Sequence, residues 1–94
     1  MSSPPIKVLL IEDDAECADA MREMLSQEKS PSFEVECAKK LQTGLERFSK
    51  GGLDVVLLDL NLTDSRGLDT LVKVQLQAKD IPIIVITGQA DETL

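Results

Sequence analysis

The sequence feature that most constrains this fold is the apolar run Val55–Leu58, which ends at an acid, Asp59. The run is too short to span a membrane and predicts a strand over residues 53–59 that is buried on both faces. Burying a carboxylate is costly, so an acid at the end of such a strand is expected where water or a cation can reach it. Asp59 could instead cap the following turn.

The rest of the chain alternates predicted strands and helices. Residues 6–11 and 83–87 repeat the continuous apolar pattern, whereas residues 33–37 alternate apolar and polar side chains, which is typical of a sheet edge. Apolar residues recur at helical spacing in three segments, about 15–28, 39–50 and 67–78. The order βαβαβαβ predicts an α/β fold in which helices cover both faces of a parallel sheet.

Local signals refine these elements. Asp64 or Ser65 is available to cap the third helix. Gly44 inside the second helix costs roughly 1 kcal/mol relative to alanine. Residues 90–94 look like the first turn of a fourth helix.

Composition narrows the function. The chain has 94 residues, enough for one domain, and 43% of them are apolar, which indicates a globular protein. Ten Lys and Arg against 17 Asp and Glu give a net charge of −7. This charge disfavours non-specific binding to nucleic acid or to anionic lipid and fits a cation or a basic partner. There is no signal peptide and no transmembrane run, so we expect a cytoplasmic location and no membrane contact.

The cysteines and the lack of histidine exclude several kinds of site. Cys17 and Cys37 are isolated and have no metal-binding spacing. We expect both to be small buried hydrophobic residues in a reducing cytoplasm. Because the chain contains no histidine, it cannot use a histidine general base, and most kinds of zinc site are excluded.

Polar residues follow three of the predicted strands. They are Glu12 and Asp13, Asp59, and Thr87 with Gly88. Parallel strands place their carboxyl ends on one edge of the sheet, which is where open α/β sheets bind ligands. Three carboxylates brought together repel one another and favour a hard cation such as Mg²⁺, with Mn²⁺ or Ca²⁺ as alternatives. A bound Mg²⁺ would keep Asp59 ionised and able to attack phosphorus.

Each of these residues also has a simpler possible role. Asp13 and Glu16 have the spacing of a capping box at the start of the first helix. Glu12 could be a solvated surface residue, and Thr87 an ordinary β-branched strand residue. The joint arrangement is more specific than any one member.

Four motifs together resemble the receiver domain of two-component response regulators, in order and with the family's spacing. They are Ile11-Glu12-Asp13-Asp14, Leu57-Leu58-Asp59-Leu60-Asn61-Leu62, Gly67 and Val85-Ile86-Thr87-Gly88. The resemblance extends from Ile6 to Leu94. It implies a doubly wound, three-layer, flavodoxin-like fold with a parallel sheet of strand order 2-1-3-4.

The resemblance also implies a role for each site residue. Asp59 would be the phosphoacceptor. Asp13 would bind Mg²⁺ directly, Glu12 mainly through water, and Asn61 through its backbone carbonyl. Thr87 would be the switch hydroxyl that bonds a phosphoryl oxygen.

Gly88 would be the small residue that leaves room for the phosphoryl group. The expected partner is a histidine kinase or a histidine phosphotransfer protein. The expected function is signalling, with no enzymatic activity beyond slow autodephosphorylation.

Two features depart from the family pattern. Thr63 stands where the family usually has proline, a mild change in loop stiffness. The 94 residues also stop before a fifth strand and the lysine that it carries in the family, and Lys79 precedes strand four and cannot replace that lysine. We therefore expect residues 1–94 to form an incomplete receiver domain, without most of helix 4, strand 5 and helix 5.

Two other functions remain open at this point. Without the family lysine, the domain could act as a receiver-like protein-interaction module that transfers no phosphoryl group. The stretch Asp59–Thr63 also faintly resembles the Asp-x-Asp-x-Thr motif of haloacid-dehalogenase phosphatases. Asn61 replaces the second acid of that motif, however, and in that family the motif follows the first strand rather than the third.

The last predicted strand has a further consequence if the 94 residues are the whole molecule. Ile83–Ile86 would then form an exposed, uncharged sheet edge. Such an edge predicts self-association, either as a homodimer or by domain swapping.

Overall fold

Four strands alternate with three helices in the computed structural model, which describes residues 4–86. The elements are β1 (Ile6–Ile11), α1 (Ala15–Ser26), β2 (Phe33–Ala38), α2 (Leu41–Phe48), β3 (Val55–Asp59), α3 (Leu68–Gln77) and β4 (Ile83–Ile86). All seven were predicted, and the boundaries differ by one or two residues at most ends. The predicted turn of helix at 90–94 lies outside the described residues.

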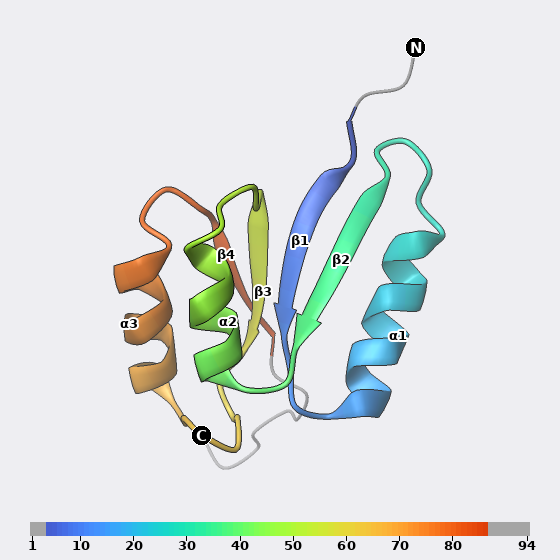
Figure 1. Cartoon of the computed structure of the whole chain (residues 1–94). Helices are drawn as coiled ribbons and strands as arrows, with labels where there is room; N and C mark the ends of the chain where they lie inside the picture. Colours follow the sequence, from blue (N-terminus) through green and yellow to red (C-terminus); the bar gives the residue numbers. More distant parts are fainter. Residues whose placement is uncertain (1–3, 87–94) are drawn as a thin grey trace.

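The strands form one parallel sheet in the order β2-β1-β3-β4, as predicted. Ile11 of β1 lies opposite Ala38 of β2 on one side and Leu58 of β3 on the other. Asp59 lies opposite Ile86 of β4. All the carboxyl ends therefore lie at one edge of the sheet, which is the lower edge in Figure 1.

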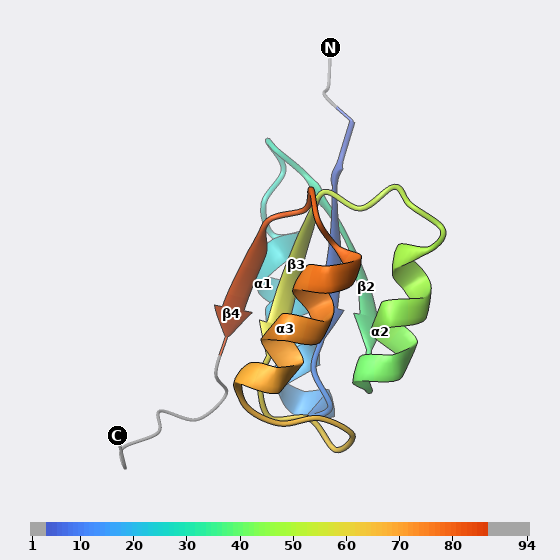
Figure 2. The same ribbon diagram turned by 90° about the vertical axis from the view of Figure 1, so that its left-hand side faces the viewer.

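Helices cover the two faces of the sheet unequally. α1 lies on one face, and α2 and α3 lie side by side on the other (Figures 1 and 2). Leu9 and Ile11 of β1 pack in the core beneath α2 and α3, while Val8 and Leu10 pack on the α1 side. All four side chains are buried, which explains the uninterrupted apolar pattern of a central strand. No helix in residues 4–86 is long and apolar enough to cross a membrane.

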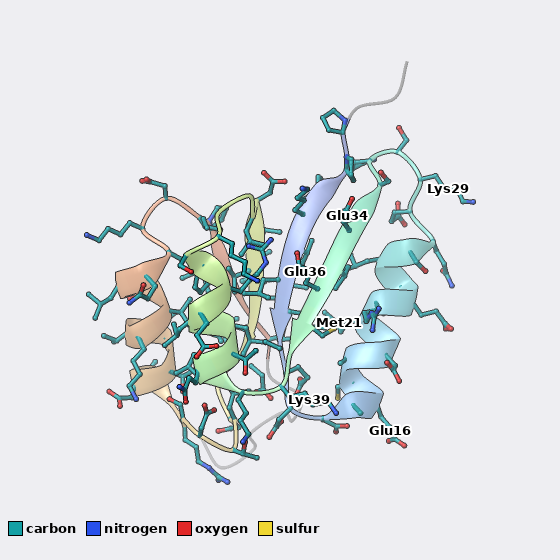
Figure 3. The ribbon with its side chains drawn as sticks, viewed as in Figure 1. Glu16, Met21, Lys29, Glu34, Glu36 and Lys39 are labelled. Carbon is teal, nitrogen blue, oxygen red and sulfur yellow. The ribbon has the colours of Figure 1, made fainter. Side chains whose placement is uncertain are left out.

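β2 is an edge strand, and its alternating sequence follows from that position. Glu34 and Glu36 are exposed, and Glu36 forms an ion pair with Arg47 of α2, with an N–O distance of 2.8 Å. Figure 3 shows both glutamates on β2 and places Met21 between α1 and this strand. The prediction that both cysteines are buried is wrong: Cys37 is exposed on this edge strand.

Cys17 is only half-buried, because it lies in the first turn of α1 and lines a cavity at the carboxyl edge of the sheet. Both thiols are free.

Gly44 has a packing reason for its place inside α2. It is buried, and a β-carbon there would lie 2.6 Å from Cδ1 and 3.0 Å from Cγ1 of Ile11. The glycine therefore lets α2 approach the end of β1 closely, which offsets its poor helix propensity.

The predicted cap of the third helix is wrong. α3 begins at Gly67 without a side-chain cap. The carboxylate of Asp64 instead accepts hydrogen bonds from the backbone N–H groups of Leu41 (2.8 Å) and Gln42 (3.0 Å) at the start of α2. These two bonds hold the pKa of Asp64 below its usual value. Ser65 turns inward, and its hydroxyl bonds that of Thr70 at 2.7 Å.

β4 is the other edge of the described sheet. Ile84 is 52% exposed and Val85 41% exposed. Within residues 4–86 no strand pairs with the outer side of β4. The exposed apolar edge is thus present, and the self-association inferred from it stays a prediction.

Candidate functional site: an acidic cluster at the carboxyl edge

Two neighbouring strands bring three acids together. Glu12 and Asp13 directly follow β1, and Asp59 is the last residue of β3. Because β1 and β3 pair in parallel with Ile11 opposite Leu58, their carboxyl ends lie side by side. One carboxylate oxygen from each acid lies within 4.8 Å of the other two. The structure therefore brings together the three carboxylates that the sequence pattern placed at this edge.

Burial changes the acidity of the cluster. Glu12 is 2% exposed and Asp59 5% exposed, whereas Asp13 is half-buried. Burial is the main cause that raises the pKa of Glu12 from 4.5 to about 7, and Asp59 beside it adds to the rise. The backbone N–H of Asp14, 3.2 Å from Glu12 Oε2, acts in the opposite direction. A proton on Glu12 thus relieves the repulsion within the cluster, as a cation would.

Asp14, rather than Asp13, caps α1. Oδ1 of Asp14 accepts hydrogen bonds from the backbone N–H groups of Glu16 (2.9 Å) and Cys17 (3.4 Å). The capping-box role considered for Asp13 is therefore wrong, and its carboxylate remains in the cluster. Figure 3 shows Glu16 and Lys39 at this same edge, where α1 begins and β2 has just ended.

The loop after β3 folds into a tight turn against the cluster. Asn61 and Arg66 lie opposite each other in an isolated antiparallel bridge. The bridge is flanked by hydrogen bonds from Leu62 N to Ser65 O and from Gly67 N to Leu60 O, both 2.8 Å. The backbone N–H of Asn61 donates to Oδ1 of Asp59 at 3.0 Å.

The pairing with Arg66 fixes the side of the loop on which the backbone groups of Asn61 lie. In a bridge of this kind, the N–H and C=O of the paired residue both point away from its partner. The N–H of Asn61 points at Asp59, so its carbonyl lies on the same side. A ligand role for this carbonyl is compatible with the geometry and stays a prediction.

A cavity of about 420 Å³ opens over the cluster. Its lining residues are Glu12, Asp13, Asp14, Cys17, Asp59, Asn61 and Arg66. The donor set of carboxylates and a carbonyl is the hard-oxygen set that Mg²⁺ prefers. Thr87 and Gly88, predicted to complete the site, lie outside the described residues.

Sequence reasoning missed Arg66 as part of this cavity. The sequence shows a basic residue seven positions after Asp59, but the bridge to Asn61 determines that this residue lines the cavity. No local pattern in the sequence specifies that bridge. Asp14 was likewise placed in the motif without a role of its own.

The parallel sheet, its strand order and the acids at its carboxyl edge define the class: a flavodoxin-like α/β domain with three carboxylates clustered at the ends of two neighbouring strands. Among known protein families, the response regulator receiver domain matches residues 8–94. The chain therefore belongs to the receiver domain family of two-component response regulators.

Curated relatives support the same family. The cell cycle response regulator CtrA of Brucella ovis and that of Brucella anthropi are each 36% identical to the chain over 85 residues. Each match covers 90% of this chain and 35% of the relative. The chain thus spans about a third of the length of these proteins.

Solved structures share the fold. The non-phosphorylated HemR receiver domain from Leptospira biflexa has a TM-score of 0.74 and 32% identity, covering 94% of this chain and 68% of that one. The MaeR response regulator bound to beryllium trifluoride has a TM-score of 0.77 and 23% identity, with coverage of 92% and 70%. A complex of histidine kinase ThkA with response regulator TrrA has a TM-score of 0.79 and 24% identity, and the match covers 95% of this chain and 74% of that one. The last two, below 25% identity, support the fold alone.

Proposed function

We propose that this domain accepts a phosphoryl group on Asp59, in the presence of Mg²⁺, from a phosphohistidine of a histidine kinase or histidine phosphotransfer protein. The observation that carries the proposal is the convergence of Glu12, Asp13 and Asp59 within 4.8 Å at the floor of an open cavity. The family assignment favours this function over the phosphatase alternative. Receiver domains are signalling phosphoacceptors rather than conventional enzymes.

The cation would be held by Asp13, Asp59 and the carbonyl of Asn61, with Glu12 acting through water. Bound there, Mg²⁺ would neutralise the cluster and the phosphoryl oxygens. The N–H of Asn61 donates a hydrogen bond to Oδ1 of Asp59, which leaves Oδ2 available as the nucleophile. Oδ2 would form a bond to phosphorus while the bond from phosphorus to the donor's imidazole nitrogen breaks. The bonding pair returns to that nitrogen, and the donor leaves as neutral imidazole because its other ring nitrogen has taken a proton from solvent.

Thr87 and Gly88 complete the proposal. The hydroxyl of Thr87 would donate a hydrogen bond to a phosphoryl oxygen, and Gly88 would leave space for it. Thr87 directly follows β4, whose last residue, Ile86, lies opposite Asp59. This register supports the assignment.

The partner and the location follow from the same chemistry. A solved complex joins the response regulator TrrA to the histidine kinase ThkA. By analogy, the kinase or phosphotransfer protein would present its phosphohistidine to the open cavity of this domain. Nucleic acid and membrane are not expected partners of a domain with a net charge of −7, and a cytoplasmic location fits such a donor.

Intact-mass spectrometry tests the phosphoacceptor function. After incubation with acetyl phosphate and Mg²⁺, the chain is expected to gain the mass of one phosphoryl group. Asp59→Asn and a sample with the metal chelated should gain nothing. An unmodified wild-type chain, or an adduct that survives in Asp59→Asn, would contradict the proposal.

Self-association through β4 is a separate proposal. The exposed apolar side chains of Ile84 and Val85, on an edge with which no strand of residues 4–86 pairs, favour pairing with a second copy. Sedimentation velocity should show a dimer whose share grows with concentration, and Ile84→Lys should abolish it. A wild-type monomer at every concentration would refute this proposal.

A further inference from the structure

Arg66 occupies a fixed backbone position at the acidic cavity. The hydrogen bonds Leu62 N to Ser65 O and Gly67 N to Leu60 O flank the pair Asn61 and Arg66 without joining its two members directly. In such a non-hydrogen-bonded pair the α-carbons are close and the two side chains share one face. Both side chains accordingly line the cavity that holds Asp59.

Side-chain hydrogen bonds fix both ends of the loop that carries Arg66. The buried hydroxyl of Thr70 bonds Ser65 at 2.7 Å and the carbonyl of Leu60 at 3.4 Å. Asp64 ties the same loop to the N-terminus of α2. These bonds fix the backbone from which the guanidinium of Arg66 extends.

The guanidinium is available for a ligand. Arg66 is the one cation among the described residues that line the cavity, alongside four acids. The ion pairs found in residues 4–86 are Arg47 with Glu36 and Lys73 with Asp69. In the described part of the chain Arg66 forms no ion pair with these carboxylates, so they do not engage its guanidinium.

We propose that Arg66 is a phosphoryl-binding residue of this domain, whose guanidinium donates hydrogen bonds to the oxygens of the phosphoryl group on Asp59. The inference rests on the phosphoacceptor function proposed above. The planar fork of arginine matches the geometry of phosphoryl oxygens and allows two parallel hydrogen bonds.

The proposal predicts effects of opposite sign on two ligands of the same cavity. A cation at the mouth of the cavity repels Mg²⁺ and attracts an anionic phosphoryl group. Removing that cation should therefore tighten Mg²⁺ binding and weaken phosphoryl binding. Damage to the fold of the loop would weaken both.

Calorimetric titration of the full chain separates these cases. The probes are Mg²⁺ alone, and beryllofluoride, an analogue of the phosphoryl group, at saturating Mg²⁺. In Arg66→Gln we expect Mg²⁺ to bind a few-fold more tightly and beryllofluoride about tenfold more weakly. Arg66→Lys keeps the positive charge but lacks the planar guanidinium. Its Mg²⁺ affinity should therefore equal that of the wild type, and its beryllofluoride affinity should lie between those of the wild type and Arg66→Gln.

Lys79→Gln is the matched control, because it removes the same charge from the exposed loop at the opposite edge of the sheet. It should change neither affinity by more than about twofold. Equal changes in Arg66→Gln and Lys79→Gln, or a loss of both ligands in Arg66→Gln, would overturn the role of Arg66. A wild-type chain that binds Mg²⁺ but no beryllofluoride would instead overturn the phosphoacceptor function on which it rests.

Discussion

The two loops that border the acidic cavity are built in different ways. The loop after β1 is short, and the helix that follows it is capped from within by Asp14. The loop after β3 runs from residue 60 to residue 67. It closes on itself through the backbone bridge of Asn61 and Arg66, and Asp64 joins it to the start of α2 by accepting two hydrogen bonds there. The first loop thus ends in a local cap, whereas the second also depends on its contact with α2.

This difference has a functional side. The first loop supplies two of the three carboxylates, including the one with the most perturbed acidity. The second contains Asn61 and Arg66, which line the cavity. Removing the carboxylate of Glu12 in the first loop should therefore change the charge balance of the cluster, whereas removing the contacts of Asp64 or Ser65 in the second should change the geometry of the loop.

The largest expected effect concerns charge in the first loop. The pKa of Glu12 is about 7 in the folded chain against 4.5 as the ordinary value. Between these values the folded chain keeps a proton that the unfolded chain has lost, so the free energy of unfolding falls as the pH rises through this range. Without Mg²⁺, Glu12→Gln should be more stable than wild type at about pH 8, by on the order of 2 kcal/mol, and indistinguishable near pH 4.

Urea denaturation at the two pH values measures this effect. Saturating Mg²⁺ should stabilise the wild type at the higher pH more than it stabilises Glu12→Gln. A variant that is equally stabilised at both pH values would show that the gain comes from packing rather than from charge.

The next effect compares the two capping acids directly. Asp64→Ala and Asp14→Ala each remove one negative charge and the acceptor of two N–H groups, and each should cost about 1 kcal/mol of stability. Only Asp64→Ala should also accelerate amide hydrogen exchange at Leu62 and Gly67, because it releases the second loop. If Asp14→Ala accelerates exchange at those amides equally, the two loops are not independent.

An effect of similar size is expected for the buried hydroxyl pair that contacts the second loop. Ser65→Ala leaves the buried hydroxyl of Thr70 with only the carbonyl of Leu60, at a cost of about 1 kcal/mol in the free energy of unfolding. Ser49→Ala removes a comparable hydroxyl, which bonds the carbonyl of Glu46 at the exposed end of α2, and should cost less than about 0.5 kcal/mol. Equal costs would mean that the buried hydroxyl pair does not support the loop.

The sequence predicts the elements of this fold because each has a clear local signal. The continuous apolar run of β1 and the strict alternation of β2 distinguish a central strand from an edge strand. The meeting of Glu12, Asp13 and Asp59 also follows from the sequence, since parallel strands end on one edge. These inferences need only periodicity and topology.

What the sequence does not predict depends on long-range geometry. Asp64 precedes α3 by four residues and has the residue type of an N-cap, yet it caps α2, because the folded loop places it there. Arg66 reaches the cavity through a bridge whose register no local pattern specifies. The exposure of Cys37 likewise depends on how far α1 covers an edge strand.

A crystal structure of the chain with Mg²⁺ and beryllofluoride tests the phosphoacceptor role of Asp59 most directly. We predict a metal ion bound by Asp13, Asp59 and the carbonyl of Asn61, with the beryllium bonded to Oδ2 of Asp59. A metal bound elsewhere, or beryllofluoride absent from Asp59 at saturating concentration, would contradict the account.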